Sequence, residues 1–254
     1  HFLEHMLFKG TERYAKGEID LVTMKNGGAN NAFTSYDFTA YYFSFASDRW
    51  QTALDIESDR MIHTIFDPAE FEAERKVVIE ELKSGLDQPW GALMQQLNAT
   101  AYRRHVYRNP VIGWMEDLEH MTVEDARFFY ERWYAPNNAT LVVVGDVKPT
   151  EVMELARKHF GPLERKTLPQ RRITEEPRQL GPQQLTVRAP AELPYVLMSF
   201  RAPALRDPEN EWEPYALEML ANVLDGNEAA RLNRTLVREK RIASSASASY
   251  DGVN

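Results

Sequence analysis

The first five residues, His1-Phe2-Leu3-Glu4-His5, constrain the fold more than any other part of the sequence. Two histidines four residues apart lie on the same face of an α-helix, about one turn from each other. Two such imidazoles can share one zinc ion if a third ligand arrives from elsewhere and a fourth position stays open for water. The pattern therefore predicts a helix over residues 1–9 and a rigid element beside it that carries a carboxylate or another histidine.

Glu4 is the candidate for a catalytic base. It lies next to His5 on the predicted helix, within reach of a water on the same metal. Zinc lowers the pKa of such a water toward about 7, and a carboxylate can take its proton during attack on a peptide carbonyl. The order His-x-x-Glu-His is the inverzincin pattern. A chance pentapeptide is the competing interpretation, and the adjacent glutamate favours the metal.

Residues 74–82, ERKVVIEEL, offer the third ligand. Glu74 and Glu81 are seven residues apart and therefore share one helix face, while Val77 and Val78 give the helix an apolar side to bury. In most glutamate-rich helices the carboxylates form a solvated surface, and we expect this of Glu80. The residues alone leave Glu80 as a competitor of Glu81 for the ligand position.

The composition restricts the kind of site and partner. The 254 residues include no cysteine, so any zinc must take nitrogen and oxygen ligands. The formal net charge of −8 argues against a nucleic-acid partner, which needs a basic surface. No apolar run is long enough to span a bilayer, so no membrane span is expected.

Periodicity and turn residues divide the chain into two lobes. Residues 1–161 are predicted to form the catalytic lobe, residues 162–183 a proline-rich linker, and residues 184–254 the start of a second lobe that lacks the zinc motif. We expect a β-hairpin within residues 32–46 that turns at Tyr36-Asp37. Further strands are predicted at residues 140–144, 184–188, 195–200 and 244–250. A helix followed by a small, polar strand occurs in both lobes, which suggests that the two lobes are related.

Several motifs in the same order resemble the pitrilysin family, which includes insulin-degrading enzymes and mitochondrial processing peptidases. They are HFLEHMLFKGT at 1–11, NAFTSYDFTAYYF at 31–43, ERKVVIEEL at 74–82, AY..H.Y at 101–107 and YAPNNATLVVVGDV at 134–147. The resemblance covers nearly the whole chain. It implies an α+β fold of two related lobes, each a mainly antiparallel sheet with helices packed on one face.

The resemblance also assigns roles to residues. It implies that His1, His5 and Glu81 bind one zinc ion per catalytic lobe, that Glu4 is the general base, and that Glu74 supports the site without ligating. Because Glu81 occupies the register of the family's ligand, the resemblance favours it over Glu80.

The family also implies how substrate binds. Asn31, Ala32 and Phe33 match the edge strand that pairs with an extended peptide substrate, and an exposed strand edge offers unpaired N–H and C=O groups for that purpose.

The family often carries an arginine and a tyrosine seven residues apart in the lobe that faces the zinc. Here Arg238 fits the arginine, but Ser245 stands at the tyrosine position. This departure implies that activity requires a dimer with a related subunit, identical or not.

The expected function is hydrolysis of peptides or unfolded protein segments by a zinc-dependent metalloendopeptidase. The alternative is a non-catalytic core subunit of a larger complex, as some members of the family are; the intact residues of the motif favour the peptidase.

The chain begins inside a motif, so we expect it to be truncated at both ends, with strands of the first lobe preceding His1. A periplasmic or secreted location is favoured over the cytoplasm.

Overall fold

In the computed structural model, which describes residues 1–171 and 174–252, a short helix lies at the centre of the main hydrophobic core. This helix, α1 (Phe2–Met6), has only five residues, too few to be stable by helix propensity alone. Phe2, Leu3, Met6 and Leu7 are buried against residues of α4 and α7. Each such side chain contributes about 1.5–3 kcal/mol by leaving water. Tertiary packing therefore holds the helix that carries His1 and His5.

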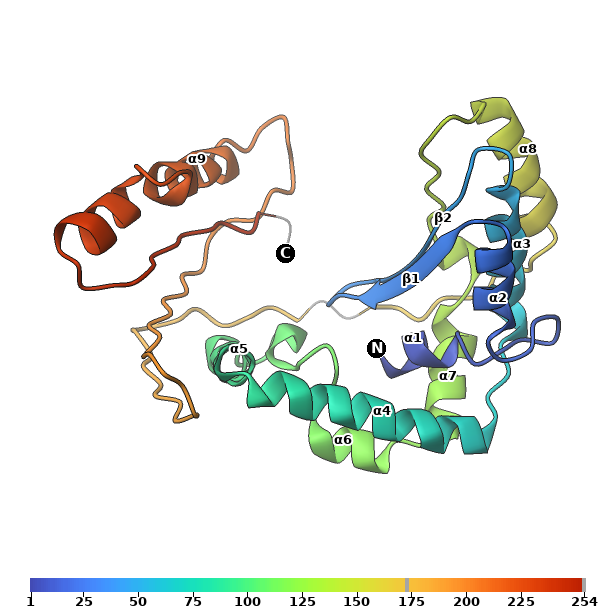
Figure 1. Cartoon of the computed structure of the whole chain (residues 1–254), viewed down its shortest axis with the longest axis horizontal. Helices are drawn as coiled ribbons and strands as arrows, with labels where there is room; N and C mark the ends of the chain where they lie inside the picture. Colours follow the sequence, from blue (N-terminus) through green and yellow to red (C-terminus); the bar gives the residue numbers. More distant parts are fainter. Residues whose placement is uncertain (172–173, 253–254) are drawn as a thin grey trace. The chain divides into compact units, whose positions relative to one another are not determined.

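The described chain divides into two units, residues 1–193 and residues 194–254. The first unit holds the following elements: α1, α2 (Glu18–Lys25), β1 (Ala29–Thr34), β2 (Thr39–Ser44), α3 (Gln51–His63), α4 (Pro68–Asp87), α5 (Pro89–Ala101), η1 (Val106–Arg108), α6 (Met115–His120), α7 (Val123–Trp133), η2 (Pro136–Asn138) and α8 (Pro149–Phe160). The second holds α9 (Glu213–Asp225) and η3 (Asn233–Glu239). Figure 1 shows these elements along the chain.

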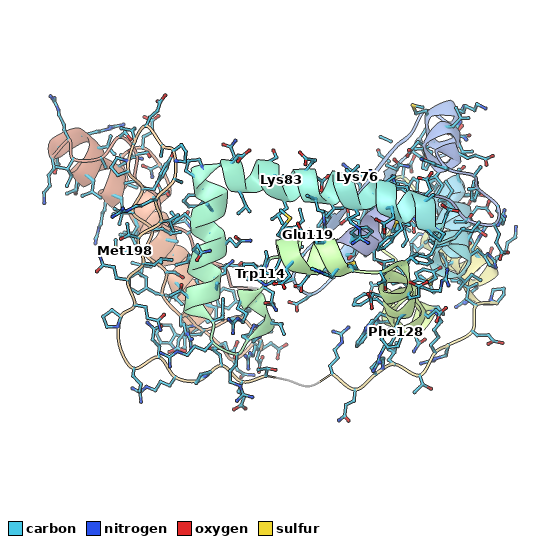
Figure 2. The ribbon with its side chains drawn as sticks, turned by 90° about the horizontal axis from the view of Figure 1, so that it is seen from below. Lys76, Lys83, Trp114, Glu119, Phe128 and Met198 are labelled. Atoms are coloured by element: carbon cyan, nitrogen blue, oxygen red, sulfur yellow. The ribbon has the colours of Figure 1, made fainter. Side chains whose placement is uncertain are left out.

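Helix α4 is the longest described element, and α1 packs against it. Its start is well defined, because Pro68 occupies the first turn and the Asp67 side chain accepts hydrogen bonds from the next two backbone N–H groups. Phe71, Glu74, Val78 and Leu82 recur every three or four residues on its buried face. The opposite face is exposed. Figure 2 shows Lys76 and Lys83 along α4, with Glu119 on the neighbouring α6.

The strands β1 and β2 pair antiparallel with Asn31 opposite Tyr42 and Ala32 opposite Tyr41. One face of the hairpin carries Thr34, Thr39 and Tyr41 and lies toward α1. The turn falls at residues 35–38, where the sequence predicted it. The chain thus has the predicted α+β class with antiparallel strands, although helices make up most of the described structure.

The strands predicted at residues 140–144, 184–188, 195–200 and 244–250 are wrong for this structure. All of these residues are described, and none of them lies in a strand. Val142 and Val144 are 74% and 91% exposed. An extended segment is stabilised only by pairing with neighbouring strands and by burying one face, and within the described residues these segments have neither.

The second unit is small and is organised around α9 and η3. The backbone N–H of Leu205, before α9, donates a hydrogen bond to the carbonyl of Gly252, after η3. The boundaries predicted from the sequence, 1–161, 162–183 and 184–254, stay a prediction, and residues 172–173 of that linker lie outside the described residues. None of the described helices has the length and apolar character needed to cross a membrane.

The cap of α4 generates a stability prediction. Asp67 accepts hydrogen bonds from the N–H groups of Ala69 and Glu70 at 2.8 and 2.9 Å. We expect Asp67→Ala to lower the free energy of unfolding by about 1 kcal/mol, measured by urea denaturation. Asp87→Ala is the matched control, because Asp87 ends the same helix, where a carboxylate opposes the helix dipole. The control should leave stability unchanged or slightly raised, and equal losses in both variants would contradict the capping role.

Candidate metal centre

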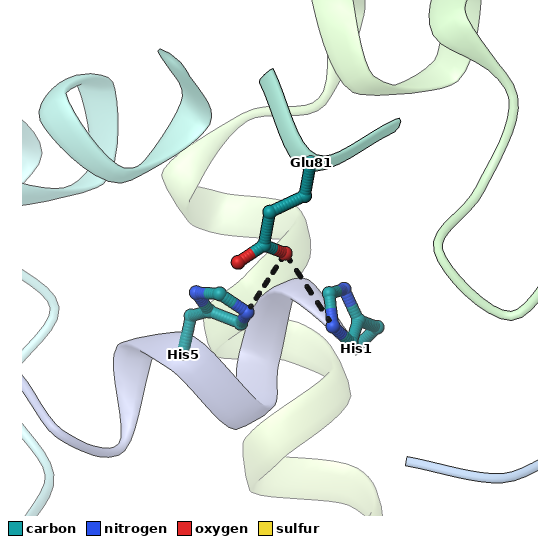
Figure 3. Close-up of side chains that lie close together, drawn as sticks. All are labelled: His1, His5 and Glu81. Atoms are coloured by element: carbon teal, nitrogen blue, oxygen red, sulfur yellow. Dashed lines mark ion pairs between the residues drawn. The ribbon is translucent and has the colours of Figure 1, made fainter. Parts of the chain in front are cut away.

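His1, His5 and Glu81 converge from two helices that are far apart in the sequence (Figure 3). His5 belongs to α1, His1 immediately precedes that helix, and Glu81 lies in the second half of α4. The Nε2 atoms of His1 and His5 are 3.8 and 3.4 Å from the same Glu81 oxygen, Oε2. One ligand atom from each residue lies within 4.8 Å of the other two, the one such group of three among the described residues.

This donor set fits a zinc ion. Bonds of about 2.0–2.2 Å to nitrogen and oxygen in a tetrahedron place neighbouring ligand atoms about 3.3–3.5 Å apart. The distance between His5 Nε2 and Glu81 Oε2 is already in that range, and the distance between His1 Nε2 and Glu81 Oε2 exceeds it by a few tenths of an ångström. Three protein ligands leave one position open for water, the arrangement of catalytic rather than structural zinc sites. The geometry is therefore compatible with the ligands inferred from the sequence.

Glu80 points elsewhere. Its side chain is 71% exposed and pairs with Lys83 one turn further along α4 at 2.8 Å. Glu81 is 44% exposed and faces the histidines. The structure thus brings Glu81 and not Glu80 to the histidine pair, because consecutive residues of a helix project about 100° apart.

Glu74 contacts His5 at Nδ1, the ring nitrogen that does not face Glu81. Its Oε1 lies 2.8 Å from His5 Nδ1, and its Oε2 forms an ion pair with Lys9. Burial alone would raise the pKa of the Glu74 carboxyl, but the hydrogen bonds from Lys9 and His5 outweigh burial and hold that pKa below its ordinary value. In the tautomer in which Nδ1–H donates to this carboxylate, Nε2 of His5 carries no proton and faces Glu81. Nδ1 of His1, in contrast, is buried without a partner among the described residues.

Glu4 is buried beside this centre and is held by the hairpin. The Thr34 hydroxyl at the end of β1 donates to Glu4 Oε2, and the Thr39 hydroxyl of β2 lies 3.2 Å from that of Thr34. Thr34 and Lys9 belong to the site although the sequence did not indicate them. Their signal was weak, because each is an ordinary polar residue inside a motif that was interpreted for its other members.

The residues predicted to bind substrate lie on two separate units. Asn31, Ala32 and Phe33 are on β1, whose second edge has no strand partner within the described chain. The N–H of Ala32 donates to the Asn31 side chain at 2.8 Å, so this group is capped locally instead of bonding to β2. Arg238 belongs to the second unit, where it pairs with Glu228 at 3.1 Å.

Comparison with known families gives two matches along the chain. A profile described as "Insulinase (Peptidase family M16)" matches residues 1–113, which include the candidate centre. A second profile, described as "Peptidase M16 inactive domain", matches residues 120–254. The division agrees with the absence of a second His-x-x-Glu-His motif from the sequence.

Individual relatives are named zinc proteases. Zinc protease PqqE of Helicobacter pylori is 34% identical over 252 residues, which are 97% of this chain and 55% of the relative. The uncharacterized zinc protease YmxG of Bacillus subtilis is 29% identical over 243 residues, 96% of this chain and 58% of the relative. The chain therefore spans about half the length of the curated relatives it matches.

Solved structures agree with these relatives. The crystal structure of a protease from Helicobacter pylori matches with a TM-score of 0.83 at 29% identity. The match covers all of this chain and 61% of the protease chain. The first half of the periplasmic protease PqqL from Escherichia coli has a TM-score of 0.62 at 28% identity, over 68% of this chain and 38% of that one.

The Glu74 contacts generate a prediction that needs no metal. Glu74→Ala leaves His5 Nδ1 and the Lys9 ammonium without their acceptor in a largely buried place. We expect a loss of about 2 kcal/mol in the free energy of unfolding, measured by urea denaturation with a chelator present. Glu80→Ala, on the exposed face of the same helix, should change stability by less than about 0.5 kcal/mol. A loss in the control as large as in Glu74→Ala would contradict this reasoning.

Proposed function

The chain belongs to the insulinase family of peptidases, family M16, and from that premise we propose that it carries the catalytic zinc site of a metalloendopeptidase. The observation that supports this most is the meeting of His1, His5 and Glu81, with Glu4 on the same turn of helix. A structural site would need no buried carboxylate beside an open ligand position. A hydrolytic site needs both.

In this proposal the zinc is bound by His1 Nε2, His5 Nε2 and the Glu81 carboxylate. Bound zinc supplies Lewis acidity that lowers the pKa of water toward about 7. Glu4 accepts the proton of the attacking water and returns it to the leaving amine, as a general base and then a general acid. The Thr34 hydroxyl fixes one oxygen of Glu4 and leaves the other free for this transfer.

An extended peptide is proposed to add to the free edge of β1. Its backbone would take over the N–H of Ala32 that Asn31 now caps, and the half-exposed Phe33 ring would contact its side chains. Binding of this kind depends mainly on main-chain hydrogen bonds. Substrates are therefore expected to be peptides or unfolded segments of varied sequence.

A related lobe is proposed to complete the enzyme. The relatives are about twice as long as this chain. In the second unit, Ser245 stands seven residues after Arg238, where the family often carries a tyrosine. The completing lobe belongs either to the same polypeptide or to a partner subunit in a homo- or heterodimer. The relative PqqL is described as periplasmic, and we propose a location outside the cytoplasm here as well.

A non-catalytic role is the second candidate, because residues 120–254 match a domain described as inactive. That match lies outside α1 and outside the segment that holds Glu81. Zinc content separates the two candidates. Purified protein that binds no zinc at neutral pH would favour the non-catalytic role and exclude the proposed peptidase.

The role of Glu4 is tested by Glu4→Gln, which keeps the shape and the hydrogen bond to Thr34 but removes the base. Cleavage of an unstructured peptide should fall by at least about 100-fold, while zinc content measured by elemental analysis stays unchanged. Cleavage at the rate of the unmodified protein would overturn the mechanism. Loss of zinc together with activity would mean that Glu4 acts as a ligand instead.

The choice of third ligand is tested by comparing two neighbouring carboxylates. Glu81→Gln should weaken zinc binding by at least about 100-fold, since an inner ligand contributes more than the groups that orient it. Glu80→Gln is the matched control and should bind zinc as the unmodified protein does. Zinc affinity is measured by competition with a chelator, and a reversal of the two results would move the site to Glu80.

A further inference from the structure

Lys9 belongs to the first motif, and its side chain contacts Glu74 although the proposed mechanism gives Lys9 no task. It follows His5 by four residues, and the chain continues in helical turns beyond α1 through the backbone bonds Phe8 to His5 and Lys9 to Met6. The side chains of Lys9 and His5 both reach Glu74. The Lys9 side chain is only 20% exposed and forms an ion pair with Glu74.

Lys9 and His5 together occupy both oxygens of one buried carboxylate. Glu74 Oε1 accepts from His5 Nδ1 at 2.8 Å, and Oε2 faces the Lys9 ammonium. A carboxylate held at one oxygen can turn about its terminal bond, whereas one held at both is fixed in its plane. Charge-assisted bonds are also about twice as strong as neutral ones. The plane of Glu74 is thus set by Lys9 as much as by His5.

We propose that Lys9 is a positioning residue for the metal centre, which acts through Glu74 to keep the proton of His5 on Nδ1 and the lone pair of Nε2 directed at the zinc. The inference rests on the proposed function, because it assigns Lys9 to the same site. Glu74 touches a ligand, and Lys9 touches Glu74. Groups that orient a ligating histidine typically contribute 10–100-fold to metal affinity, so Lys9 belongs at the lower end.

The chain offers a control with the same chemistry. Lys16 pairs with Glu70, one turn before Glu74 on α4, at 2.8 Å. This pair also links the N-terminal segment to α4, but it touches no candidate ligand and its lysine is 59% exposed. A purely structural contribution of Lys9 would resemble that of Lys16. A positioning role would not.

The experiment measures zinc affinity of the whole protein by chelator competition at a fixed neutral pH. We expect Lys9→Met to weaken zinc binding about tenfold, Lys9→Arg to stay within about threefold, and Lys16→Met to equal the unmodified protein. The unmodified protein must itself bind zinc, and failure there would overturn the proposed function as a whole. Zinc binding by Lys9→Met within twofold of normal would overturn the positioning role alone.

A second measurement keeps the inference testable if Lys9→Met does not fold. The tautomer of His5 in metal-free, unmodified protein is read from the nitrogen chemical shifts of its ring by NMR. We expect the proton on Nδ1, and in folded Lys9→Met a mixture of both tautomers. A proton found mainly on Nε2 in the unmodified protein would overturn the proposal, as would an unchanged tautomer in Lys9→Met.

Discussion

Packing of α1 against α4 is the contact on which the rest of the structure depends. Phe2, Leu3, Met6 and Leu7 are buried in one cluster with the apolar stripe of α4. Because protein interiors are packed as densely as organic crystals, this contact leaves little freedom in the distance or rotation between the two helices. His1 and His5 at α1 and Glu81 on α4 are therefore held close together by apolar side chains.

Two buried carboxylates in this core need hydrogen-bond or ion-pair partners, and those partners belong to the candidate metal centre. Glu4 is buried and bonded to Thr34, while Glu74 is buried and bonded to His5 and Lys9. An unpaired carboxylate in such a place would be strongly destabilising. The same groups that compensate burial also fix which way each carboxylate faces. Stability and orientation of the centre thus have a common physical origin.

A buried cation beside the hairpin combines an ion pair with contacts to aromatic rings. The Arg60 side chain is 1% exposed and lies over the Tyr41 ring at 4.3 Å, with Phe8 and Phe43 also within 6 Å. Its Nη2 forms an ion pair with Glu57, whereas Nε and Nη1 have no hydrogen-bond partner among the described residues. The ion pair and the attraction to the ring faces together compensate the burial of this cation. The aromatic face of β2 is thereby attached to α3. Because β2 pairs with β1, this attachment also supports the strand that carries Thr34.

The sequence by itself predicted that His1 and His5 lie on the same side of one helical turn, because residues four apart are neighbours on a helix face. It also predicted the hairpin and a helix over residues 1–9, of which residues 2–6 are helical and residues 7–9 form turns. The choice of Glu81 over Glu80 came from family resemblance, and only the rotation of α4 in the packed core brings Glu81 to the histidines. Contacts between residues distant in sequence determined the other members of the site. Thr34 and Lys9 contact partners 30 and 65 positions away, and no local sequence pattern predicts such contacts. The strands expected after residue 139 failed for the same reason, since an apolar run becomes a strand only where a neighbouring strand is present to pair with it.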